Sequence, residues 1–139
     1  MFNCLYFDVK NNKIDLIKIS DSLELIKKKL DIDSPITIVT RKIGSRYYDI
    51  ICDDEGLFKT EDDGKVVVGA ICLNCEEFLA GNLLITKNDS YDKFDKEDYD
   101  NLKQSIFQTK EQVDFDYNTS IGLVNVKFKK DSYFISYKV

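Results

Sequence analysis

The sequence predicts an α+β fold in which a mostly antiparallel sheet has two short helices packed on one face. Short segments rich in β-branched and aromatic residues recur along the 139 residues, with turn residues between them. Two other segments repeat apolar residues at helical spacing. The chain has one proline, six glycines and no linker-like stretch, so we expect a single domain over residues 1–139.

The first part of the chain predicts a β-hairpin followed by a helix. Residues 2–9 and 14–19 have strand composition, and polar turn residues separate them. Asp21 is predicted to cap the helix, with Glu24 completing a capping box. The apolar residues of this segment fall on one face, so we expect an amphipathic helix laid on the sheet.

The remaining elements alternate between strands and one further helix. We expect strands at residues 36–43, 47–52, 66–73 and 82–86, and a helix from a cap at Asp95 to about residue 107. The chain then ends in a β-hairpin within residues 121–139, where apolar and polar residues alternate on both arms, 124–128 and 133–137.

The composition removes whole classes of catalytic site. The chain contains no histidine, so a Ser/His or Cys/His nucleophile pair and a His-ligated zinc or iron site cannot form. No glycine-rich phosphate-binding motif is present either. We therefore expect a protein that is not an enzyme and that uses no cofactor.

The sequence also indicates a compartment. The N-terminal residues lack the uncharged apolar stretch of a secretory signal, and the longest such run elsewhere, residues 66–75, is too short to span a bilayer. We expect a cytoplasmic protein without membrane association, with its four cysteines reduced.

Acidic residues concentrate in the middle of the chain. Residues 1–48 carry a net charge of +3, residues 49–116 of −11 and residues 117–139 of +3, which together give the overall −5. This distribution disfavours direct nucleic-acid binding, which depends on Lys and Arg neutralising phosphates. It suits a partner protein with a basic surface, although a solvated acidic face that keeps the protein soluble is the simpler interpretation.

Two acidic segments, residues 49–63 and 89–100, are the candidate binding surfaces. In the second, aromatic rings are interleaved with carboxylates and can anchor on a basic groove. The same acids are also typical of turns and of a helix N-terminus, where the helix dipole favours them. The predicted binding residues are Asp53, Asp54, Glu55, Asp92, Phe94, Asp95, Glu97, Asp98, Tyr99 and Asp100.

Two kinds of metal or redox chemistry have weaker support. Cys72 and Cys75 form a CxxC pair, which is half of a zinc site or a redox pair, but no second pair follows, so ordinary thiols are expected. Acids between Asp49 and Asp63 are of the type that chelates Mg²⁺ or Ca²⁺ in a hydrolase. Their spacing does not match a calcium loop, and we predict no metal.

A small-ligand or nucleotide-derivative binding protein is the alternative function. Tyrosine rings stack on ligands in pockets that offer few polar contacts. The tyrosines proposed for this role are Tyr47, Tyr48 and Tyr133.

Three short motifs carry a resemblance to a known family. Residues 48–56 (YDIICDDEG), residues 79–86 (LAGNLLIT) and the SLE at residues 22–24 resemble a family of small uncharacterised proteins from phages, plasmids and integrative elements of low-GC bacteria. The resemblance covers about residues 13–107 and leaves the C-terminal hairpin outside it. That family has no established activity, so the resemblance implies no catalytic residue.

What the resemblance implies is a setting, because small accessory proteins of mobile elements often bind and inhibit host proteins. Together with the acidic middle of the chain, it predicts a non-catalytic accessory protein of a phage or mobile element. We expect this protein to bind and inhibit a basic host protein through its acidic segments.

Overall fold

The computed structural model describes residues 1–8, 11, 13–56, 66–72, 77–88, 91–109 and 119–128. The elements in chain order are β1 (Phe2–Asp8), β2 (Lys13–Ile19), α1 (Leu23–Leu30), β3 (Ile36–Ile43), β4 (Arg46–Asp53), β5 (Val66–Cys72), β6 (Glu77–Ala80), β7 (Leu83–Lys87), η2 (Tyr91–Lys93), α2 (Lys96–Ser105), β8 (Ile106–Thr109) and β9 (Thr119–Phe128).

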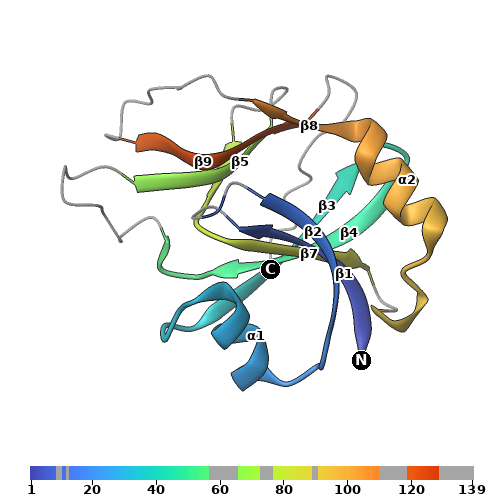
Figure 1. Cartoon of the computed structure of the whole chain (residues 1–139), viewed down its shortest axis with the longest axis horizontal. Coiled ribbons are helices and arrows are strands. Elements are labelled where there is room, and N and C mark those ends of the chain that lie inside the picture. The colour runs from blue at the N-terminus through green and yellow to red at the C-terminus, as the bar shows by residue number, and fades with distance from the viewer. Residues whose placement is uncertain are drawn as a thin grey trace.

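A five-stranded antiparallel sheet in the order β2-β1-β7-β4-β3 forms the centre of the structure (Figure 1). The predicted fold class, α+β with a mostly antiparallel sheet and two short helices, is confirmed. The strands predicted at the corresponding positions are also present, and their ends differ from the prediction by at most one residue.

The two helices pack on opposite faces of this sheet, whereas the sequence predicts both on one face. On one face, Ile26 and Leu30 of α1 pack against residues that include Leu84 of β7. On the other face, Leu102 of α2 packs against residues that include Ile85. Because side chains alternate along a strand, Leu84 and Ile85 point to opposite sides.

The central strands β1, β7 and β4 are therefore apolar on both faces. The burial of Leu83, Leu84 and Ile85 is complete in β7, which lies in the middle of the sheet. This uninterrupted apolar run is typical of a strand that is covered on both sides. It gives no indication of which helix covers which face, which is why the sequence did not separate them.

The cap of helix α1 also differs from the prediction. Ser22, rather than Asp21, is the N-cap, and its Oγ accepts a hydrogen bond from the Leu25 N–H at 3.4 Å. Serine caps as well as aspartate does, and here it is the residue that precedes the helix directly. The helix ends at Asp31, whose left-handed backbone (φ 60°, ψ 47°) lets its N–H donate to the carbonyls of the last turn.

A second, four-stranded sheet has the order β6-β5-β9-β8. It lies on the same side of the central sheet as α2, because Leu79 of β6 packs against the core that contains Leu102. Strand β9 pairs in parallel with β5 and antiparallel with β8. Strand β6 was not predicted, and the helix predicted to run to about residue 107 ends at Ser105, where Ile106 begins β8.

Only part of the predicted C-terminal hairpin lies within the described residues. Its first arm, residues 124–128, belongs to β9. Its second arm, residues 133–137, lies outside the described residues. Among the helices that the structure describes, none is long and apolar enough to cross a membrane.

Candidate functional site

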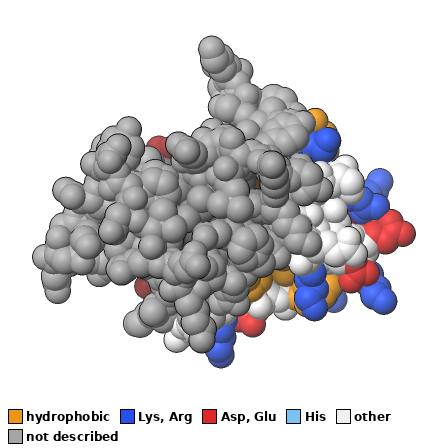
Figure 2. Space-filling view, turned by 90° about the horizontal axis from the view of Figure 1, so that it is seen from above, with side chains coloured by type: hydrophobic (Ala, Val, Ile, Leu, Met, Phe, Trp, Pro, Cys, Tyr) orange, Lys and Arg blue, Asp and Glu red, His pale blue; other side chains and the backbone are white. Residues whose placement is uncertain are grey.

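The predicted binding residues fall in two separate regions of the structure. One follows β7 and includes η2 and the first turns of α2, and the other is the end of β4. Figure 2 shows the molecule from above, and on the part of this face where side chains are described, Lys and Arg lie next to Asp and Glu. The acidic residues of the sequence therefore do not form one uniform acidic surface there.

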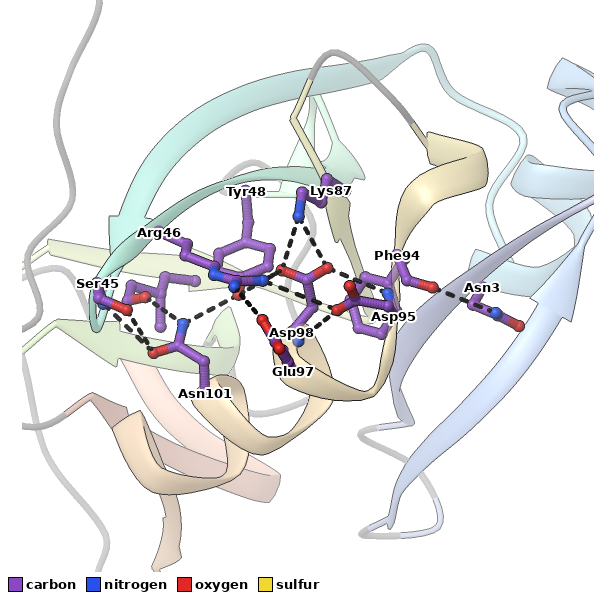
Figure 3. A network of polar contacts seen from close by, with 11 residues as sticks. Asn3, Ser45, Arg46, Tyr48, Lys87, Phe94, Asp95, Glu97, Asp98 and Asn101 are labelled. Carbon is purple, nitrogen blue, oxygen red and sulfur yellow. Dashed lines mark hydrogen bonds and ion pairs between the residues drawn. The ribbon is translucent and has the colours of Figure 1, made fainter.

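In the α2 region, the central residue is a fully buried carboxylate. Asp98 is 0% exposed and accepts hydrogen bonds from Arg46 Nη1 at 2.9 Å, Lys87 Nζ at 3.1 Å and the Tyr48 hydroxyl at 3.1 Å. Asn101 Nδ2 in turn donates to the Tyr48 hydroxyl at 2.9 Å. These five residues, which we name the Asp98 anchor, join α2 to β4 and β7 (Figure 3).

The first turn of α2 explains why Asp98 points inward. The Asp98 N–H donates to Asp95 Oδ1 at 3.0 Å, and the Asp95 N–H donates to Asp98 Oδ2 at 3.1 Å. This reciprocal pair is a capping box in which the third residue of the helix carries the second carboxylate. The cap predicted at Asp95 is therefore confirmed, and the cap itself holds Asp98 over the ends of β4 and β7.

The surroundings of Asp98 determine its ionisation. Burial by itself raises the pKa of this carboxyl, but hydrogen bonds from Arg46, the Asp95 backbone, Lys87 and Tyr48 outweigh burial and lower the pKa to about 2. Asp98 is therefore an anion at neutral pH, and its charge is matched by two basic side chains.

Other predicted residues of this region are also engaged within the protein. Phe94 is buried in the core, with its ring 6.5 Å from that of Tyr48. Tyr99 is half-buried and lies under the Lys103 ammonium, 4.9 Å from the ring centroid. Phe94 and Asp98 thus lie inside the protein, where they cannot contact a partner directly.

The exposed acids of the α2 region are balanced by bases. Arg46 contacts Glu97 at 2.7 Å and Asp95 at 3.7 Å, in addition to Asp98. Among the described residues of this region, five acids are accompanied by five bases, so the formal charges of these ten residues sum to zero. The acids are Asp92, Asp95, Glu97, Asp98 and Asp100, and the bases are Arg46, Lys87, Lys93, Lys96 and Lys103.

The β3–β4 turn is fitted against the side of α2. Asn101 Nδ2 donates to the Ile43 carbonyl at 2.9 Å, and Asn101 Oδ1 accepts from the Ser45 N–H at 3.3 Å. Gly44 has a positive φ of 64°, and a Cβ there would collide with the Ser105 hydroxyl. A glycine is needed at this position for both reasons.

The second region brings together acids that are distant in the sequence. The Asp54 N–H donates to the Pro35 carbonyl at 3.0 Å, and Ser34 Oγ donates to Asp53 Oδ1 at 2.6 Å. These bonds hold the loop before β3 against the turn after β4. The two segments contribute four carboxylates, which we name the acidic sheet end: Asp33, Asp53, Asp54 and Glu55.

The acidic sheet end differs from the α2 region in its exposure and partners. Asp33, Asp54 and Glu55 are exposed, whereas Asp53 is half-buried and also accepts from the Glu55 N–H at 2.9 Å. In the described part of the chain, no ion pair joins Asp33, Asp54 or Glu55 to a lysine or arginine. Sequence reasoning did not include Asp33, because only the contact between the two loops places it there.

The alternative sites are not assembled by the described residues. Over those residues, no group of three or more His, Cys, Asp or Glu side chains is arranged to hold a metal ion. Burial raises the pKa of Cys4 to about 12 and that of Cys52 to about 11, so both are inert thiols. The side chain of Cys72 and the whole of Cys75 lie outside the described part.

The tyrosines proposed for ligand stacking do not share a surface. Tyr48 is fully buried, whereas Tyr47, the residue before it in β4, is 42% exposed and points to the other face of the sheet. Tyr133 lies outside the described residues.

Comparisons with protein-family models, with curated proteins and with solved structures returned no match. The resemblance to the mobile-element family therefore stays a prediction.

Proposed function

We propose that this protein is a non-catalytic binding protein that docks on a basic surface of another protein through the acidic sheet end. The observation that carries the proposal is the convergence of Asp33, Asp54 and Glu55, exposed and without a described ionic partner. Carboxylates in this state are well hydrated and available to an incoming cation. They steer a basic partner toward the site and fix its orientation more than they add affinity.

The α2 region is a poorer candidate for the same role. Its acids are already paired with Arg46 and Lys87, or lie within three residues of an exposed lysine in the chain. A partner would have to displace these contacts before it gained its own. The proposal therefore moves the binding surface from residues 89–100 to the end of β4, and keeps Asp54 and Glu55 from the sequence prediction.

The biological role that fits this surface is that of a small cytoplasmic accessory protein of a phage or mobile element. A compact acidic protein that covers the basic surface of a host protein inhibits it by occupying that surface. The resemblance in residues 13–107 and the net charge of −11 over residues 49–116 support this role.

Affinity capture from bacterial lysate with matched charge variants tests the proposal. The test variant reverses two charges at the acidic sheet end, Asp54→Lys with Glu55→Lys. The control reverses two exposed charges at the α2 region, Asp92→Lys with Asp100→Lys. Both variants change the net charge equally, so a difference between them reports position rather than total charge.

We expect a basic protein that the wild type and the α2-region control capture and the acidic-sheet-end variant does not. Because exposed charges are screened by salt, the capture should fall steeply between about 0.1 M and about 0.5 M salt. Equal capture by both variants would contradict the proposal, and loss in the control alone would return the binding surface to α2.

A further inference from the structure

Strand β2 is the most open strand of the central sheet. It forms one edge of this sheet, and within the described part of the chain it pairs only with β1. Four of its seven side chains are exposed, and only Ile19 is buried. Leu16, at the midpoint of the strand Lys13–Ile19, is 51% exposed. An edge of this kind offers its outer row of backbone N–H and C=O groups to a further strand.

The opposite edge of the sheet, β3, is more closed. Of its eight side chains, only Ile38 is exposed. The Thr40 carbonyl also accepts a hydrogen bond from the Arg41 guanidinium at 3.0 Å. A chain that adds a strand to the central sheet therefore meets less obstruction at β2 than at β3.

The sequence of β2 is complementary to itself when two copies run antiparallel. A two-fold axis through Leu16 pairs all seven residues of one copy with the seven of the other, because Leu16 is the midpoint of the strand. Leu16 then lies opposite Leu16 of the second copy. Directly opposite side chains share a face of the sheet and contact each other, so each leucine covers the exposed surface of the other.

The charges of β2 fit the same register. Each charged residue lies opposite an isoleucine of the second copy, and the pairs are Lys13 with Ile19, Asp15 with Ile17 and Lys18 with Ile14. A shift of two residues in one direction places Asp15 opposite Asp15, and a shift in the other direction places Leu16 opposite Lys18. Either shift leaves only five of the seven residues paired. The charges and the apolar pattern therefore both favour the register centred on Leu16.

We propose that two copies of this chain pair antiparallel through β2, with the two-fold axis at Leu16, and join their central sheets into one continuous sheet. The inference goes beyond the proposed function, because it uses the edge of the sheet that lies away from β3 and β4. In this dimer the two β3 strands are nine strand spacings apart, or about 43 Å. Both acidic sheet ends stay uncovered, so the dimer is bivalent.

The pairing is weak and responds to salt. A seven-residue ladder with one central leucine contact is smaller than a stable interface, so we expect a Kd on the order of 0.1 mM. Each copy carries a net charge of −5, and the nearest like charges are the two Asp15 carboxylates, which lie diagonally across the ladder. Salt screens this repulsion and should strengthen the pairing, whereas it weakens the capture of a basic partner.

Sedimentation equilibrium of the complete chain tests the proposal. Between about 10 μM and about 2 mM protein, the average mass should rise from the 16.1 kDa of one chain toward twice that value. NMR spectra over the same range locate the interface, because amide chemical shifts should change with concentration in β2 and β1 only. A chain that stays monomeric throughout, or concentration-dependent shifts in other strands, would overturn the inference.

Two matched variants test the position of the axis. Leu16→Lys and Ile38→Lys each add one positive charge at an exposed apolar residue of an edge strand, with exposures of 51% and 49%. Leu16→Lys places two ammonium groups directly opposite each other and should weaken the pairing by about tenfold or more. Ile38→Lys should leave the Kd within about twofold of the wild type. Equal effects of the two variants would contradict pairing through β2.

Asp15→Asn gives a second test at an exposed residue whose replacement leaves the core intact. It removes the nearest like charges, so it should strengthen the pairing about twofold to fivefold and reduce its dependence on salt. An unchanged Kd at low salt would exclude the register centred on Leu16. The proposed function is tested separately, because Leu16→Lys leaves Asp54 and Glu55 in place and should still capture the basic partner as a monomer.

Discussion

The α2 region and the acidic sheet end have similar acidic sequences and opposite structural roles. At α2, the central acid Asp98 points inward and holds a helix to the sheet with two bases. At the end of β4, Asp54 and Glu55 point outward, and only their backbone N–H groups take part in described hydrogen bonds. One set of carboxylates stabilises the fold, whereas the other consists mainly of exposed charges without a described ionic partner.

An acidic run in a sequence therefore does not by itself predict an acidic surface. The bases that pair with Asp98 come from β4 and β7, and Arg46 is 52 residues from Asp98 in the chain. The acid that is added to the other region by the fold, Asp33, comes from the loop before β3. The net charge of a surface therefore depends on which segments the fold brings together, not on the charge of one stretch of sequence.

The largest expected effect is the loss of the Asp98 anchor. Asp98→Ala leaves Arg46, Lys87 and Tyr48 without their shared acceptor at a buried position. We expect a loss of about 3 kcal/mol in the free energy of unfolding, since removing one partner of a buried charge pair strands the others. Urea denaturation followed by circular dichroism measures it.

The matched control for this prediction is Asp100→Ala, which removes an exposed acid from the same helix. It should change stability by no more than about 0.5 kcal/mol. If the two variants lose the same amount of stability, α2 is held by the apolar contacts that its Leu102 makes with the sheet rather than by the Asp98 anchor.

The second effect is a dependence of stability on pH that belongs to the α2 region. The pKa of Asp98 is lowered to about 2 from an ordinary value of 3.8, so the unfolded chain takes up this proton first as the pH falls. Stability from this group is thus complete above about pH 4 and is lost between about pH 4 and pH 2, for a total of about 2 kcal/mol.

Asp98→Asn isolates this contribution, because it keeps the size of the side chain. The stability difference between the wild type and Asp98→Asn should be largest near neutral pH and should shrink below pH 4. A difference that stays constant down to pH 2 would show that the carboxylate charge is not what stabilises the folded state.

The sequence predicts the positions of the strands better than the placement of the helices or the direction of single side chains. The strands of the central sheet could be predicted closely, because segments rich in β-branched and aromatic residues and turn residues such as those at 44–45 are local signals, whereas β6 and β8 were not predicted. The positions of α1 and α2 on opposite faces could not, since β7 is apolar on both sides. The cap at Asp95 was predictable from local chemistry, whereas the inward direction of Asp98 depends on Arg46 and Lys87.

The candidate site shows the same division. Asp54 and Glu55 were predictable as exposed turn residues, because Asp, Glu and Gly favour turns for reasons of backbone geometry. The place of Asp33 beside them was not, because it depends on a contact between two loops. A local sequence pattern predicts whether a side chain lies in a turn or a strand, but its contacts depend on which distant segments the fold brings together.

The third effect concerns the turn that fits against α2. Gly44→Ala introduces both an unfavourable positive φ and a clash with Ser105, for an expected loss of about 2 kcal/mol. Gly81→Ala is the matched control, because Gly81 has a similar φ of 73° with no atom within 4 Å of an added Cβ. It should lose only about 1 kcal/mol. Equal losses in thermal or urea unfolding would show that the turn moves away from α2 without cost.

The smallest effect on stability is expected at the acidic sheet end, where the comparison between the two regions is sharpest. Asp54→Asn with Glu55→Gln removes two exposed charges that have no described ionic partner, and should change stability by less than about 0.5 kcal/mol. Asp95→Asn with Glu97→Gln removes the same charge but breaks contacts with Arg46 and weakens the cap of α2, at a cost of about 1 kcal/mol.

Urea denaturation at about 20 mM and about 0.5 M salt separates the ionic contribution from that of the cap, because salt screens the interactions between charged side chains. Salt should therefore narrow the gap between the variants without closing it, since the hydrogen bond of the cap persists in salt. A larger loss at Asp54 and Glu55 than at Asp95 and Glu97 would reverse the assignment of the two regions, making the acidic sheet end the structural one.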